Sequence, residues 1–64
     1  MTDAEKLEWA RIELERRAEE EAAVTSPEEM AEMKRLRAFR RRRAGLSRAE
    51  TRDLLARVAM AWAA

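Results

Sequence analysis

Hydrophobic side chains recur along this chain at the spacing of α-helices rather than at the alternating spacing of strands. Toward the C-terminal end, one helical face carries Thr51, Leu54, Leu55, Val58, Ala61 and Trp62. In the middle of the chain, the side chains that lean to one side are Met30, Met33, Leu36 and Phe39, with Arg37 and Arg40 at the edge. Near the N-terminal end the stripe is narrow and rich in alanine: Ala4, Leu7, Ala10, Leu14, Ala18 and Ala22.

Three helix-start signals divide the chain. The segments Thr2–Glu5, Ser26–Glu29 and Ser47–Glu50 each fit a capping box, in which a hydroxyl caps the helix and a glutamate reaches back. Pro27 suits a first helical position, and Gly45 suits the left-handed residue that ends a helix. These signals predict helices over residues 3–23, 27–44 and 48–63.

Length and connections favour one small all-α domain over residues 1–64. The linkers are short, which predicts a compact three-helix bundle or a helical hairpin plus a third helix. A chain of 64 residues without cysteine buries a modest core and has no disulfide to support it. We therefore expect self-association, with a homodimer favoured, to complete the fold.

Two large side chains of the first predicted helix lie away from its apolar stripe. At about 100° per residue, Trp9 and Ile12 fall near the opposite face from Leu7 and Leu14. Either the helix is packed between two neighbours of its own chain, or the pair forms a second contact surface. Large apolar side chains of this kind are typical anchors of protein interfaces.

Charge is balanced overall but divided between the halves of the chain. The net charge is +1, with 42% of residues charged. Residues 1–32 carry four basic and eleven acidic side chains, whereas residues 33–64 carry ten basic and two acidic ones. Such polarity between halves indicates either internal charge matching or an oppositely charged partner.

The densest basic stretch is the run from Arg40 to Arg43. In a helix, Arg40 points toward the apolar stripe, Arg43 lies at its flank, and Arg41 and Arg42 point away. One interpretation is charge matching with the side of the first helix that carries Glu8, Glu15 and Glu19. The alternative is binding of nucleic-acid phosphates by the more outward basic side chains, namely Lys34, Arg35, Arg41, Arg42 and Arg48.

The stretch Leu36–Glu50, LRAFRRRRAGLSRAE, resembles the opening of lambda-repressor-like helix-turn-helix domains. Those domains often combine a leucine- and arginine-rich helix with a Gly-Leu-Ser turn and a second short helix. The resemblance extends to Leu55 but departs at Thr51 and Arg52, where the family has a Leu-Ala pair. No base-reading residue is carried over, and the shared pattern is a common way of ending one helix and capping the next.

Residues that perform chemistry are scarce. The chain has no histidine, cysteine or tyrosine, and both serines occupy cap positions. No nucleophile has a neighbouring base, and Glu19, Glu20 and Glu21 point in three directions around a helix, so we predict no enzyme, no metal site and no cofactor. The acidic N-terminus has no apolar core segment and the longest apolar run is short, so we expect no signal peptide, no membrane role and a cytoplasmic location.

These observations predict a small, non-catalytic helical module that binds a protein partner, such as an adaptor, inhibitor or assembly factor of the kind that bacteria or their phages encode. The partner would present an acidic or apolar surface. Its contacts would be the apolar anchors Trp9 and Ile12 and the basic residues Arg35, Arg41 and Arg42. A nucleic-acid-binding regulator is the alternative.

Overall fold

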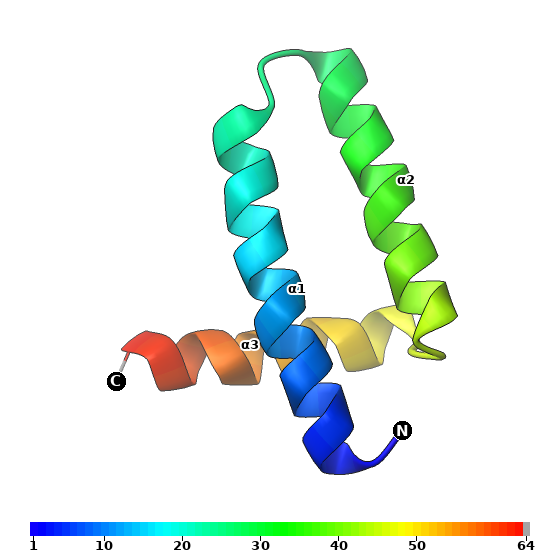
Figure 1. Ribbon diagram of the computed structural model, residues 1–64, viewed down its shortest axis with the longest axis vertical. Coiled ribbons are helices and arrows are strands. Elements are labelled where there is room, and N and C mark those ends of the chain that lie inside the picture. Colours follow the sequence, from blue (N-terminus) through cyan, green and yellow to red (C-terminus); the bar gives the residue numbers. More distant parts are fainter. Residues whose placement is uncertain (64) are drawn as a thin grey trace.

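The computed structural model describes residues 1–63, and within them every regular element is a helix. Helix α1 spans Asp3–Ala23, α2 spans Pro27–Arg43 and α3 spans Arg48–Ala63 (Figure 1). The predicted all-α fold is confirmed. The predicted bounds agree with the observed ones except at the end of the second helix, where Ala44 is the cap rather than the last helical residue.

Side-chain caps fix where the helices begin. At α1, the Glu5 amide donates to the Thr2 hydroxyl over 3.2 Å, and the Thr2 amide donates to the Glu5 carboxylate over 2.9 Å. The same reciprocal pair joins Ser47 and Glu50 at the start of α3, with distances of 3.1 and 3.0 Å. At α2, the amide of Glu29 donates to the Ser26 hydroxyl. Each cap satisfies backbone donors that a helix start otherwise leaves unpaired.

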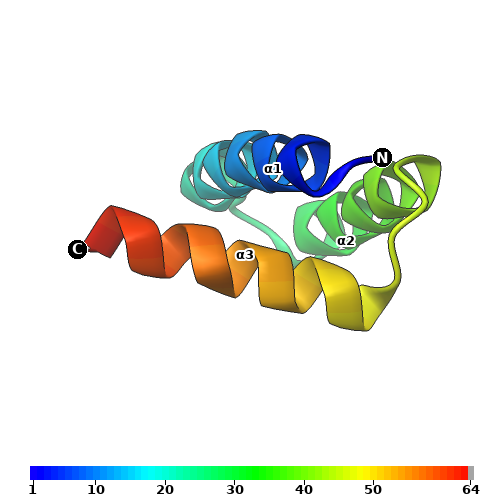
Figure 2. The same ribbon diagram turned by 90° about the horizontal axis from the view of Figure 1, so that it is seen from below.

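The three helices form two layers. Helices α1 and α2 run side by side in opposite directions as a hairpin. Helix α3 starts near the end of α2 and crosses α1 steeply near the middle of α3 (Figure 1). A view from below places α3 in a separate layer beneath the hairpin (Figure 2). Because α3 lies across α1, the apolar contact of the fold is concentrated between these two helices.

The hydrophobic core lies at this crossing. Its buried members are Ala10, Leu46, Leu54, Leu55 and Val58, with the partly buried Trp9, Leu14 and Ala44 packed against them. The only buried side chain that α1 contributes to this apolar cluster is an alanine, which lets the backbones of α1 and α3 approach closely. Thr51 is buried beside them, and its hydroxyl donates to the Ser47 carbonyl over 2.9 Å.

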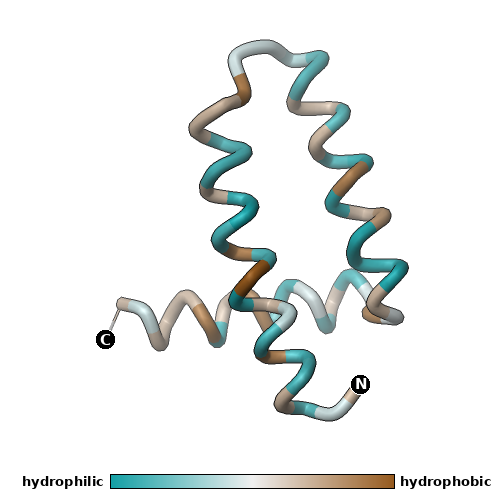
Figure 3. The backbone as a smooth tube through the Cα atoms, viewed as in Figure 1, coloured by the Kyte–Doolittle hydropathy of each residue, from teal (hydrophilic) through white to brown (hydrophobic). Residues whose placement is uncertain are grey.

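The apolar stripe expected on the second helix is not part of this core. No residue of α2 is buried, and Leu36 and Phe39 are 43% and 53% exposed. Figure 3 shows the same helix as a largely hydrophilic segment with isolated hydrophobic positions. The stripe stays open because α3 packs across α1, so α2 has no apolar partner on that side.

The ends of the other two predicted stripes are also open. Trp62 is 52% exposed, and Leu7 is exposed on α1. Helices that cross steeply contact each other only near the crossing point, so periodic apolar residues farther along each helix remain outside the core.

Candidate functional site: a basic groove beside a buried ion-pair layer

A layer of ion pairs joins α1 to α2 where apolar contact is thin. The Glu13 carboxylate, which is 2% exposed, accepts hydrogen bonds from Nε and Nη2 of Arg40 at 2.6 and 2.8 Å. Its second oxygen also accepts from Nε of Arg17 at 3.0 Å. About two turns farther along α1, the Glu20 carboxylate accepts hydrogen bonds from both Arg37 and Arg40 at 3.0 Å. The two carboxylates therefore hold three guanidinium groups between the helices.

Charge states in this layer are set by the pairing. Burial alone would raise the pKa of Glu13, but the hydrogen bonds from Arg40 and Arg17 outweigh it and leave the pKa below its ordinary value. Burial would likewise raise the pKa of Glu20, but the hydrogen bonds from Arg40 and Arg37 together outweigh it and lower the pKa. The hydrogen bond to Glu13 raises the pKa of Arg40. Glu13, Glu20 and Arg40 are thus ionised at neutral pH.

The first and second helices do pair acidic with basic side chains, as expected, but the glutamates involved are not the expected ones. Glu8 and Glu15, which we expected to face the second helix, instead pair with Arg11 on their own helix at 2.6 and 3.0 Å. Glu19 is exposed and forms no ion pair within residues 1–63. The residues that sequence reasoning missed are Glu13 and Glu20. The spacing in the sequence could have identified Glu13, because it lies three residues after Ala10 and therefore on the face of the helix that meets the rest of the fold.

The turn that ends α2 fixes the position of the Arg41 side chain. Gly45 adopts a left-handed φ of 75°, and the chain closes a Schellman turn. In that turn Leu46 N–H donates to the Arg41 carbonyl over 3.2 Å, and Gly45 N–H donates to the Arg42 carbonyl over 3.0 Å. The Arg41 side chain returns to the Leu46 carbonyl at 3.0 Å, so its guanidinium is held at the junction between α2 and α3.

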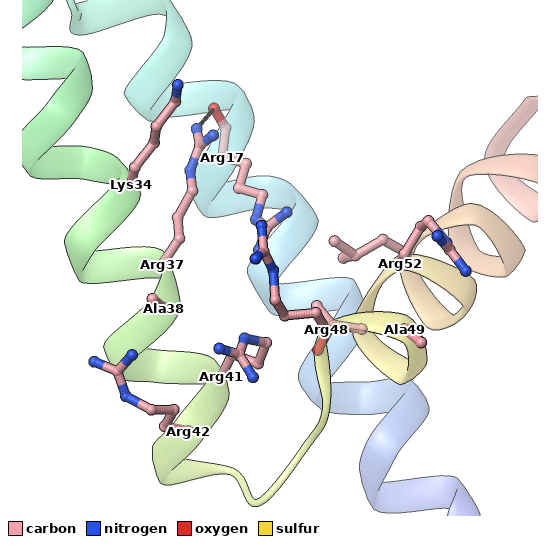
Figure 4. Close-up of a pocket in the computed structure, with 11 residues that line it drawn as sticks. Arg17, Lys34, Arg37, Ala38, Arg41, Arg42, Arg48, Ala49 and Arg52 are labelled. Atoms are coloured by element: carbon pink, nitrogen blue, oxygen red, sulfur yellow. Dashed lines mark hydrogen bonds between the residues drawn. The ribbon is translucent and has the colours of Figure 1, made fainter.

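A strongly basic groove lies between α2, the first half of α3 and the middle of α1 (Figure 4). Its volume is about 1060 Å³. Seven basic side chains and no acidic one line it; the remaining lining residues are Ala38, Ala49, Thr51 and Leu55. The basic residues are Arg17, Lys34, Arg37, Arg41, Arg42, Arg48 and Arg52. We call this surface the basic groove.

These seven cations are not equivalent. Arg17 and Arg37 belong to the ion-pair layer, and exposed Arg52 has Asp53 at 3.6 Å. Lys34, Arg41, Arg42 and Arg48 have no carboxylate oxygen within 4.0 Å among residues 1–63. The basic groove therefore has an inner wall whose cations are paired with carboxylates and a rim of four cations without a carboxylate partner among residues 1–63.

The structure brings together most of the basic residues singled out in the sequence. Lys34, Arg41, Arg42 and Arg48 all line the basic groove, although they come from two helices. Arg35 is exposed but is not part of the lining. Sequence reasoning did not include Arg17, which reaches the groove from α1 only through the packing of the helices. It also did not include Arg37 and Arg52, which lie within about one turn of other groove cations on their own helices.

The two predicted apolar anchors, Trp9 and Ile12, differ in burial. Trp9 is half-buried and packs against the core, so only part of its side chain is available to a partner. Ile12 is 40% exposed on the same helix. The sequence left open whether this pair was core or contact surface; in the structure Trp9 packs partly against the core and Ile12 is exposed.

Other chemistry is limited in the part of the chain that the structure describes. Residues 1–63 contain no group of three potential metal-ligating side chains. Over the same residues, no helix combines the length and the hydropathy needed to cross a lipid bilayer. No family model matches the chain, and no match was found among curated proteins or solved structures.

Proposed function

We propose that this protein binds nucleic acid through the phosphate backbone, with the basic groove as its contact surface. The observation that carries the proposal is the lining of that groove by seven basic side chains without an acidic one, in a chain whose net charge is only +1. Charge concentrated on one surface raises the local potential and attracts polyanions even when the whole protein is near neutral.

The ion-pair layer supports this proposal. Glu13 and Glu20 form their ion pairs with the arginines of the layer. The rim cations Lys34, Arg42 and Arg48 have no carboxylate partner among the described residues. Of the four arginines of the run, only Arg40 belongs to the ion-pair layer, and Arg41, Arg42 and Arg43 have no carboxylate partner among the described residues. Arginine suits phosphate because its planar guanidinium donates two parallel hydrogen bonds to the anion.

The groove favours phosphates over an acidic protein surface because no exposed large apolar or aromatic side chain lines it. Its largest apolar lining residue is Leu55, which is already buried in the core. Protein interfaces draw most of their affinity from a desolvated apolar or aromatic centre surrounded by a polar rim. Such a centre is missing from the described lining, whereas phosphate binding requires none.

The residues present favour backbone contact over base reading. The chain contains no asparagine or glutamine, which are common partners of adenine, and no aromatic residue lines the groove to stack on an unpaired base. We therefore expect double-stranded nucleic acid to be bound with little sequence preference.

Fluorescence anisotropy of a labelled mixed-sequence DNA duplex, titrated with wild-type protein and with variants, tests the proposal. The double variant Arg42→Gln/Arg48→Gln removes two rim cations and should weaken binding roughly tenfold or more. The matched control Arg16→Gln/Arg57→Gln removes the same charge from exposed residues outside the groove and should bind nearly as wild type does. Equal losses in both pairs, or no binding by the wild type near physiological salt, would overturn the proposal.

A second candidate function is binding of a protein on the outer side of α1. The observation that favours it is Ile12, an apolar side chain that is 40% exposed, with the half-buried Trp9 on the same helix. Exposed Arg35 and the rim arginines Arg41 and Arg42 would then orient an acidic partner. Ile12→Asp should abolish capture of such a partner without lowering helicity or duplex affinity, and unchanged capture would exclude this surface.

A further inference from the structure

The side of α2 that faces away from the basic groove carries a self-complementary pattern. Glu32, Leu36, Phe39 and Arg43 follow one another at intervals of four, three and four residues. This is the spacing of a coiled-coil seam, which places all four side chains along one stripe of the helix. We call this stripe the α2 seam.

Nothing in the described part of the chain covers the α2 seam. Leu36 and Phe39 are 43% and 53% exposed, and Glu32 and Arg43 are exposed as well. Glu32 and Arg43 form no ion pair within residues 1–63, so both charges are available to a partner. An apolar pair flanked by unpaired charges of opposite sign has the composition of a small interface core with a polar rim.

We propose that a second copy of this chain docks antiparallel on the α2 seam. A two-fold axis midway between Leu36 and Phe39 places Leu36 of each copy opposite Phe39 of the other. The same axis places Glu32 of each copy opposite Arg43 of the other. One symmetry operation therefore covers both apolar side chains and pairs all four charges.

The charge pattern selects both the partner and its direction. In a parallel pair, Glu32 would meet Glu32 and Arg43 would meet Arg43, and such like-charge contacts are unfavourable. In the antiparallel pair, each of the two contacts between Glu32 and Arg43 joins opposite charges. The seam thus has what an isologous two-fold interface requires, since the same stripe serves both copies.

The geometry also predicts a reversible dimer that leaves the basic groove open. A helix of 17 residues is about 25 Å long, so a single helix pair makes a small interface whose occupancy depends on concentration. At about 100° per residue, the seam lies nearly opposite Lys34, Ala38 and Arg41, which line the groove. Dimerisation and duplex binding should therefore be separable by mutation.

Sedimentation equilibrium over a range of protein concentrations tests the inference. The wild type should dimerise reversibly, and Phe39→Asp should weaken association roughly tenfold or more because it buries a charge at the centre. The matched control Met60→Asp changes an apolar residue that is 74% exposed on α3, and should associate as the wild type does. Circular dichroism of both variants should retain the wild-type helicity, since both positions are exposed.

A charge swap tests the antiparallel register. Glu32→Arg and Arg43→Glu should each weaken the dimer, because each places like charges opposite one another at both ends. The double variant Glu32→Arg/Arg43→Glu should restore association, and an equimolar mixture of the two single variants should form a heterodimer. A monomeric wild type at about 1 mM, association unaffected by Phe39→Asp, or no heterodimer in the mixture would each overturn the inference.

Discussion

The carboxylate of Glu13 and the guanidinium of Arg40, 27 residues apart in the sequence, form a two-bond ion pair at 2.6 and 2.8 Å. The carboxylate is almost completely buried, and the guanidinium is 16% exposed. This pair connects the two arms of the helical hairpin where apolar packing is thin. Arg40 is therefore part of the scaffold, whereas Arg41 and Arg42 of the same run line the basic groove.

Breaking the pair on one side should destabilise the fold more than replacing both sides. Glu13→Leu leaves Arg40 and Arg17 without their buried partner and should lower the free energy of unfolding by about 2–3 kcal/mol. Glu13→Leu/Arg40→Met replaces the pair with apolar groups and should recover most of that loss. Urea unfolding followed by circular dichroism measures both, and a double variant less stable than the single one would contradict this account of the layer.

Stability should fall in acid because of the same layer. The pKa values of Glu13 and Glu20 lie below their unfolded values of about 4.3, so both contribute stability that is present above that pH. The contribution is lost as the pH falls through the folded-state pKa values, because these carboxylates bind protons more readily in the unfolded chain than in the folded protein. Urea unfolding at neutral pH and near pH 2.5 should show the loss.

The control for this pH dependence is Glu13→Gln/Glu20→Gln. This variant should be less stable at neutral pH, and its stability should change less between the two pH values. The exposed Glu5, Glu8 and Glu50 also have lowered pKa values, so a part of the acid effect should remain. An unchanged pH dependence would show that Glu13 and Glu20 are not its main source.

Gly45 should tolerate few substitutions for reasons of backbone conformation rather than space. A Cβ atom there would meet nothing within 4 Å, but φ is 75°, in the left-handed region. Gly45→Ala should therefore cost about 1 kcal/mol of unfolding free energy, and Gly45→Asn less, since asparagine adopts this conformation more readily. Thermal or urea unfolding of the two variants gives the comparison. Equal stability of Gly45→Ala and wild type would contradict it.

Local signals in the sequence predicted the helices well. Hydroxyl caps at Thr2, Ser26 and Ser47 and the left-handed Gly45 act within a few residues, so they can be recognised without knowledge of the fold. The helix bounds that they predicted are confirmed to within one residue.

The packing of the helices could not be predicted in the same way. Periodicity shows which side of a helix is apolar, but not at what angle a neighbour crosses it. Leu36 and Phe39 appeared as core residues and are exposed, because α3 crosses α1 instead of covering α2. For the same reason the sequence indicated a charge match without identifying Glu13, and it did not place Arg17 of α1 beside the groove cations of α2 and α3.

The measurement that tests the central claim most directly is the salt dependence of duplex binding by the wild-type protein. Anisotropy titrations at several salt concentrations give the slope of the logarithm of the association constant against the logarithm of salt concentration. If the rim cations Lys34, Arg41, Arg42 and Arg48 each meet a phosphate, the slope should be steep, about −3 to −4. A slope near zero, or no binding even at low salt, would contradict the claim that the basic groove receives the nucleic-acid backbone.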